Sequence, residues 1–146
     1  MAPAAGSCSC GAVKITFDTT PEVTVICHCT QCQKMTSGPF TTSVIIELDK
    51  LKVDGETKTY TSMKTGSGLP SYSHFCPVCG TMLYGTGDWS PGKAAVRTGV
   101  LDGDGLSRYV PSVEINAESK AKWLASQEGT MVFQKKPPAA LTPRDI

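Results

Sequence analysis

The stretch Cys27-His28-Cys29-Thr30-Gln31-Cys32 places three thiols within six residues. Thiols this close are too crowded for a strain-free disulfide framework, but they are well placed to close on one metal ion. Four more cysteines form two shorter pairs, Cys8-Ser9-Cys10 and Cys76-Pro77-Val78-Cys79. The chain is therefore organised around two predicted zinc sites, one closed by protein ligands and one with an open position.

The closed site is predicted from the two short pairs. Thiolates are strong zinc ligands, and a structural zinc ion usually takes four of them in a tetrahedron. The predicted ligands are Cys8, Cys10, Cys76 and Cys79. Pro77 stiffens the second turn, and Gly80 lets backbone amides point at sulfur. Such a site would tie the N-terminal strand to the middle of the chain, so its closure would contribute to folding.

The central triplet supplies three ligands, Cys27, Cys29 and Cys32, where zinc prefers four. Three protein ligands and one exchangeable position form the usual catalytic zinc site. We expect His28 outside the coordination shell, because the middle side chain of an extended Cys-His-Cys segment points away from its neighbours; it could still carry protons nearby. In one alternative, another residue completes a second closed zinc site at the triplet. In another, the whole chain is a zinc-ribbon-like binding module without catalysis.

Length and composition favour one zinc-binding domain over residues 1–136, followed by a flexible tail over 137–146 that opens with Pro137-Pro138. The net charge of +1 gives no strong attraction to nucleic acid or to anionic membranes. The N-terminus lacks the features of a signal peptide, and no stretch approaches the ~20 apolar residues of a spanning helix. We therefore expect a cytoplasmic monomer or homodimer with a small-molecule substrate, in a reducing compartment where seven cysteines bind metal.

The hydrophobic pattern predicts a mainly-β fold. Val13, Ile15 and Phe17 alternate with polar residues, as in a half-buried strand, and residues 40–48 suit a central strand. Further strands are expected over 23–27, 72–75, 82–84, 94–98 and 110–115. Asp54-Gly55 predicts a hairpin whose return strand covers 58–61. We expect one helical turn over 30–35 and a short C-terminal helix from Asn116 to about Gln127.

These motifs resemble the glutathione-dependent formaldehyde-activating enzyme (GFA) family, also called the centromere-protein-V family, of Mss4-like fold. The match runs from 6–13 through 27–32 and Ser37-Gly38 to 75–81, and more weakly over 113–124, where members carry a Trp like Trp123. The resemblance implies a β-tent of several small antiparallel sheets. It also implies a structural zinc ion on the two short pairs and a catalytic zinc ion on the triplet. Many members have Arg-Lys where this chain has Gln33-Lys34.

The family's namesake activity adds glutathione to formaldehyde, giving S-hydroxymethylglutathione, and is classed as a carbon–sulfur lyase. The resemblance thus implies glutathione as a co-substrate, held as a thiolate near the open zinc position. Residues expected to line the substrate pocket or to bind an anionic substrate are Ser37, Gly38, Phe40, Lys34, Lys64 and Arg97. Trp89, in a Gly/Pro loop, could cover the site. Two alternatives are zinc-dependent lyase, dehydratase or hydrolase chemistry on a larger metabolite without glutathione, and a non-catalytic zinc-binding interaction module.

Overall fold

The computed structural model describes residues 3–137. Over this range the strands form an antiparallel sheet in the order β1-β2-β5 and a larger sheet in the order β11-β10-β3-β4-β9-β8-β7-β6. The strands are β1 (Ala4–Ser7), β2 (Lys14–Phe17), β3 (Val23–Cys27), β4 (Thr41–Glu47), β5 (Leu51–Asp54), β6 (Lys58–Ser62), β7 (Ser71–Phe75), β8 (Met82–Gly87), β9 (Lys93–Arg97), β10 (Val113–Ile115) and β11 (Met131–Val132). The helices are α1 (Thr30–Thr36) and α2 (Gly105–Arg108), with 3₁₀ turns at Leu48–Lys50, Thr98–Val100 and Ala117–Ser119.

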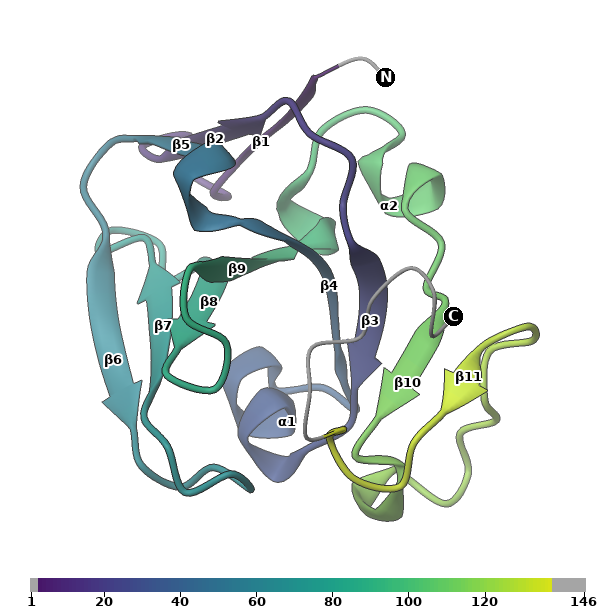
Figure 1. The fold of residues 1–146 in the computed structure, drawn as a ribbon. Coiled ribbons are helices and arrows are strands. Elements are labelled where there is room, and N and C mark those ends of the chain that lie inside the picture. Colours follow the sequence, from purple (N-terminus) through teal and green to yellow (C-terminus); the bar gives the residue numbers. More distant parts are fainter. Residues whose placement is uncertain (1–2, 138–146) are drawn as a thin grey trace.

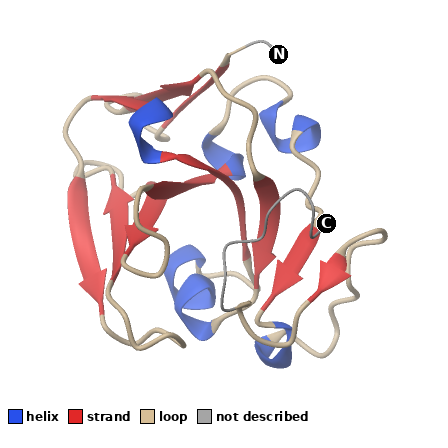
Figure 2. Cartoon of the chain, viewed as in Figure 1, coloured by secondary structure: helices blue, strands red, loops and turns tan. Residues whose placement is uncertain are grey.

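The predicted mainly-β fold is confirmed. Figure 1 shows the large sheet curving from β6 on one side to β11 on the other, with the small sheet across one end and α1 near the opposite end. Figure 2 shows how little of the chain is helical. Most neighbouring strands are antiparallel, but β10 runs parallel to both β3 and β11. That parallel pairing brings the late part of the chain beside the central cysteines.

Alternation in β2 buries one face of the small sheet against the large one. Ile15 and Phe17 are buried while Lys14 and Thr16 are exposed, so the sequence pattern predicted this strand correctly. The shared core also includes Val44, Ile46, Leu83 and Val96 from the large sheet. A second cluster of Val23, Val25 and Val113 lies on β3 and β10 and is joined by Phe133. Apolar burial of this kind provides most of the driving force for folding.

The predicted central strand and helical turn are both confirmed. β4 lies between β3 and β9 in the large sheet. Between β3 and β4 the chain forms α1, where the Cys29 side chain accepts from the backbone amide of Cys32 at the N-cap. Ser37 ends the helix in the left-handed region (φ 51°). The helix is therefore short, and its first turn carries two of the three central thiols.

The predicted hairpin at Asp54-Gly55 is wrong. β5 pairs with β2, whereas β6 pairs with β7, so the two strands belong to different sheets. Gly55 (φ +108°) is needed for another reason: a Cβ there would lie 2.3 Å from the carbonyl oxygen of Ala12. Asp-Gly marks a tight turn, but here the long-range pairing with β2 overrides the local hairpin preference.

The predicted helix from Asn116 to Gln127 is also wrong. Asn116 adopts a left-handed conformation (φ 56°), and only the single 3₁₀ turn Ala117–Ser119 follows it. The amides of Ala117 and Glu118 donate to the carbonyls of Phe133 and Gln134. In the first turn of a helix, these amides would have no hydrogen-bond partner within the helix. Here they bind carbonyl groups of the returning chain, and these hydrogen bonds hold the segment in a loop. The predicted tail over 137–146 lies, apart from Pro137, outside the described residues, and the single-domain assignment stays a prediction.

Candidate metal centre

Four cysteines meet where the turn after β1 approaches the turn after β7. Their sulfur atoms all lie within 4.8 Å of one another, and the set is Cys8, Cys10, Cys76 and Cys79. Cys8 and Cys10 lie in the turn after β1, and Cys76 and Cys79 lie in the turn after β7, as the sequence predicted. The sulfur of Cys8 accepts from the amide of Val13 (3.2 Å), and that of Cys79 contacts the hydroxyl of Thr81 (3.2 Å). Such donors favour thiolates, and the hydrogen bond from Thr81 lowers the pKa of Cys79 to about 5. This cluster can hold one metal ion with sulfur ligands alone.

Three cysteines meet at the C-terminal end of β3, beside α1 (Figure 1). Cys27 ends the strand, Cys29 is the N-cap of α1, and Cys32 lies in its first turn. Their sulfur atoms lie within 4.8 Å of one another. Over residues 3–137, no His, Asp, Glu or further Cys joins them within that distance. The structure thus brings the predicted triplet together.

Each central sulfur accepts a hydrogen bond from a donor other than the thiols of the triplet. Asn116 Nδ2 donates to Cys27 (3.3 Å), the amide of Cys32 donates to Cys29 (3.3 Å), and the hydroxyl of Thr41 donates to Cys32 (3.2 Å). Donors of this kind stabilise sulfur in its ionised form. Sequence reasoning missed Thr41 and took Asn116 for a helix cap, because both reach the site through strand pairing rather than through spacing.

The donor set fits a divalent cation. Hydrogen bonds from Cys27 and Cys32 lower the pKa of Cys29 to about 2. The same interaction with Cys29, together with Cys32 and burial, raises the pKa of Cys27 well above its usual value. Three crowded sulfurs can therefore all be ionised only beside a positive charge. A zinc ion supplies that charge and prefers these ligands.

His28 points away from the triplet, as the alternation of an extended segment predicts. It is 1% exposed, and its Nε2 atom lies 2.8 Å from Glu114 Oε2. Its ring packs edge-on against Phe40, with ring centroids 5.8 Å apart. Glu114 is equally buried and also accepts from the amide of Gln127 (2.6 Å). The buried pair of His28 and Glu114 fixes the turn between Cys27 and Cys29, and nothing in the sequence pattern marked Glu114 for that role.

The residues predicted to line the pocket or to bind an anionic substrate differ in their contacts and exposure. Arg97 is close enough to Cys32 to interact electrostatically, and it donates to Ser43 Oγ (2.5 Å). Lys34 is an exposed residue in the last turn of α1, and Lys64 is exposed in the loop after β6. The Gly38 amide donates to the carbonyl of Gln33 (3.2 Å) and so closes the helix. Arg97 is therefore the predicted cation that the fold places beside a central thiol.

Trp89 and Lys136 form a contact that sequence reasoning did not anticipate. The ammonium of Lys136 lies 3.9 Å from the centroid of the Trp89 ring. Lys136 also interacts electrostatically with Cys27. The loop after β8 and the segment after β11 therefore meet through this contact.

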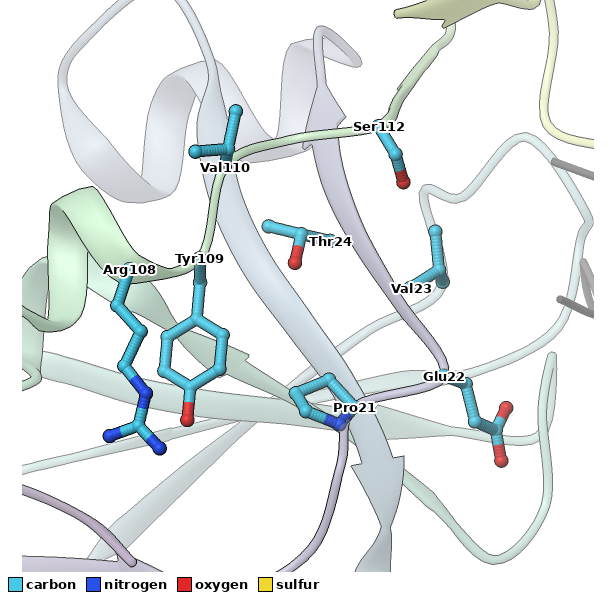
Figure 3. A pocket seen from close by; sticks show the side chains of 8 residues that line it. All are labelled: Pro21, Glu22, Val23, Thr24, Arg108, Tyr109, Val110 and Ser112. Carbon is cyan, nitrogen blue, oxygen red and sulfur yellow. The ribbon is translucent and has the colours of Figure 1, made fainter. Parts of the chain in front are cut away.

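Two surface cavities lie away from both cysteine clusters. The larger, of about 320 Å³, lies between the start of β3 and the segment after α2. Figure 3 shows its lining, with Arg108 and Tyr109 on one side and Glu22 across from them. A second cavity of about 240 Å³ is lined by residues near Ala4 and Gly105. Neither contains a cysteine, so neither supplies an enclosed pocket beside the triplet.

The chain is thus a mainly-β protein with one four-thiol and one three-thiol cluster, each of which could hold a metal ion. The family model described as glutathione-dependent formaldehyde-activating enzyme matches residues 3–119. The chain belongs to that family, as the sequence motifs indicated.

Comparison with solved structures supports the fold. A crystal structure of a Rhodobacter sphaeroides protein is similar, with a TM-score of 0.55 and 22% sequence identity, over 68% of this chain and 88% of that one. At this identity the similarity shows the fold alone. No curated protein matches the chain. Among the described residues, no helix is long and apolar enough to cross a membrane.

Proposed function

We propose that this protein is a zinc-dependent carbon–sulfur lyase that adds a thiol such as glutathione to a small carbonyl such as formaldehyde, or reverses that addition. The observation that carries the proposal is the difference between the two clusters. Four sulfurs gather in one and three in the other, over the described chain. Zinc bound by Cys27, Cys29 and Cys32 would acidify a thiol at its remaining position and polarise the carbonyl.

The reaction needs no oxidant or reductant. The thiol loses its proton, its sulfur forms a bond to the carbonyl carbon, and the carbonyl π electrons move to oxygen, which takes up a proton. The reverse step breaks the carbon–sulfur bond and returns the carbonyl. The protein would help to stabilise the three zinc-bound thiolates, through the donors on Asn116 and Thr41 and the amide of Cys32.

Arg97 and the buried pair of His28 and Glu114 would act in different ways. The charge of Arg97 favours an anionic substrate beside Cys32, because opposite charges attract strongly where solvent is partly excluded. His28 and Glu114 would keep the turn between Cys27 and Cys29 in place, since both are held by the hydrogen bond between them. They are positioning residues, whereas Arg97 would touch substrate.

The test uses the equilibrium between ¹³C-formaldehyde and glutathione, followed by exchange spectroscopy in solution. The zinc-loaded protein should accelerate exchange between free and thiol-bound carbon in proportion to its concentration. Cys29→Ser should abolish the acceleration while the fold and one zinc ion per chain are retained. Thr30→Ala, at the exposed neighbour of Cys29, is the matched control and should retain activity. Equal exchange rates with and without protein would refute the proposal, as would full activity in Cys29→Ser.

A further inference from the structure

The helix α1 and its N-cap carry two of the three central thiols, yet apolar packing does little to hold this helix in place. All seven residues of α1 are described, and none of them is buried. The position of a surface helix is usually fixed by a buried apolar face, which α1 lacks. Polar contacts are therefore needed to set where Cys29 and Cys32 lie relative to Cys27 at the end of β3.

Gln33 supplies such a contact, because its side chain joins α1 to two other segments. Its Nε2 atom donates to the carbonyl of His28 (2.8 Å) and to the carbonyl of Ser119 (2.9 Å). A carbonyl oxygen only accepts, so these two partners require the amide nitrogen of Gln33 and use both of its hydrogens. One side chain thereby connects α1 to the turn between Cys27 and Cys29 and to the 3₁₀ turn after β10 (Figure 1).

The 3₁₀ turn that contains Ser119 is a firm anchor for this contact. Its first two amides bind carbonyl groups of the chain after β11, and the Ser119 amide donates to the carbonyl of Asn116 (3.1 Å). The side chain of Asn116 also donates to the sulfur of Cys27 (3.3 Å). The same short segment therefore contacts Cys27 directly and reaches the helix with the other two thiols through Gln33.

We infer that Gln33 is a positioning residue of the triplet: its amide holds α1 so that Cys29 and Cys32 face Cys27 and can bind one metal ion together. The inference rests on the proposed function in taking the triplet as a metal site, but it does not depend on the reaction at that site. Both side-chain hydrogen bonds of Gln33 go to carbonyl groups, so the residue acts on the metal through the helix. Without them, α1 is less restrained relative to Cys27.

Cadmium NMR can examine both clusters in one spectrum. Thiolates are soft ligands that bind Cd²⁺ as they bind zinc, and the chemical shift of bound ¹¹³Cd depends on the number and arrangement of its sulfur ligands. The protein loaded with ¹¹³Cd should give one resonance for each cluster. Gln33→Met keeps the approximate size of the side chain and removes its donors. This variant should shift or broaden the resonance of the triplet and leave that of the four-thiol cluster unchanged.

Competition with a chelator measures the affinity of each cluster in the same spectra. In Gln33→Met, the triplet should bind Cd²⁺ about tenfold more weakly, since loss of a group that orients metal ligands usually costs about 10–100-fold in affinity. Gln31→Met, on the same helix, is the matched control, because the Gln31 side chain forms no hydrogen bond to a described residue. It should leave both resonances and both affinities as they are in the parent protein.

The inference is overturned if Gln33→Met leaves the resonance and affinity of the triplet unchanged, even where it lowers Tm. It is also overturned if Gln31→Met changes them equally, or if the parent protein gives no resonance for the triplet. Should Gln33→Met not fold, Gln33→Asn takes its place with the same expectation, because its side chain is one methylene shorter and cannot reach both carbonyls.

The exchange assay tests the proposed function separately. Exchange activity combined with Cd²⁺ binding that does not depend on Gln33 would remove this inference alone. Cd²⁺ binding that depends on Gln33, without exchange activity, would remove the proposed function alone.

Discussion

Glu114 links the C-terminal part of the chain to the central cysteines, so its carboxylate can be tested directly. It is 1% exposed and lies 2.8 Å from His28 Nε2 and 3.6 Å from Lys120 Nζ. It also accepts from the amide of Gln127 (2.6 Å) and the hydroxyl of Thr130 (3.1 Å). Glu114→Gln keeps the size of the side chain and removes its charge. The variant therefore isolates the electrostatic part of these contacts.

The expected loss of stability follows from the burial of the pair. Removing one partner of a buried ion pair destabilises a protein by about 3–5 kcal/mol. The lower end of that range applies here, because Lys120 is 18% exposed and solvent screens its charge in part. The glutamine oxygen can also still accept from Gln127. We therefore expect the free energy of unfolding to fall by about 3 kcal/mol.

Urea denaturation of the zinc-loaded protein measures this change as a shift in midpoint at constant slope. Glu118→Gln, at an exposed residue of the nearby 3₁₀ turn, is the control and should stay within about 0.5 kcal/mol of the parent protein. A change below about 1 kcal/mol for Glu114→Gln, with the slope unchanged, would refute the reasoning, because surface substitutions reach nearly that size.

The effect should also depend on pH in a defined direction. Burial raises the pKa of Glu114, but hydrogen bonds from His28, Gln127 and Thr130 and the charge on Lys120 together lower it below its usual 4.5. A lowered acid pKa means that the ionised form stabilises the fold above pH 4.5 and that this stabilisation disappears as pH falls through the folded-state value. The difference in stability between parent and Glu114→Gln should therefore be constant near neutrality and shrink in acid. A difference that grows in acid would contradict this assignment.

Three further predictions concern the two clusters and the small sheet. Cys76→Ser should lower Tm strongly and release zinc, whereas Cys29→Ser should leave Tm nearly unchanged; similar melts for both would show that the clusters do not differ in role. Titration with a chelator should remove the zinc ion of the triplet first, with little change in circular dichroism, and the second ion with unfolding; simultaneous loss would contradict it. Gly6→Ala should destabilise the protein by more than about 1 kcal/mol, because its Cβ would lie 2.2 Å from the carbonyl oxygen of Val100; an unchanged urea midpoint would contradict the close packing of β1 on that turn.

The parts of the site that lie close in sequence could be predicted, and the parts that depend on long-range pairing could not. Ligand counting predicted both sets of cysteines, and the alternation of an extended strand predicted that His28 points away from the triplet. Glu114 meets His28 only because β10 pairs in parallel with β3, and no local pattern specifies that pairing. Lys136 reaches Trp89 for the same reason, since β11 follows β10.

The two wrong elements have the same origin. Asp54-Gly55 has the local signal of a hairpin, but β5 pairs with β2 in the smaller sheet. Residues after Asn116 have helix-forming composition, but Ala117 and Glu118 use their amides to bind the returning strand segment. Local propensity determines the structure of a segment less strongly than tertiary hydrogen bonding does. A sequence pattern therefore identifies these segments but does not determine which other segments they bind.

The most direct test of the two-cluster account is a crystal structure of the zinc-loaded protein, with zinc located by anomalous scattering. The account predicts one ion held by Cys8, Cys10, Cys76 and Cys79, and a second held by Cys27, Cys29 and Cys32 with a solvent or substrate atom as its fourth ligand. A side chain of this protein in that fourth position, or disulfides joining the cysteines in place of the ions, would contradict it.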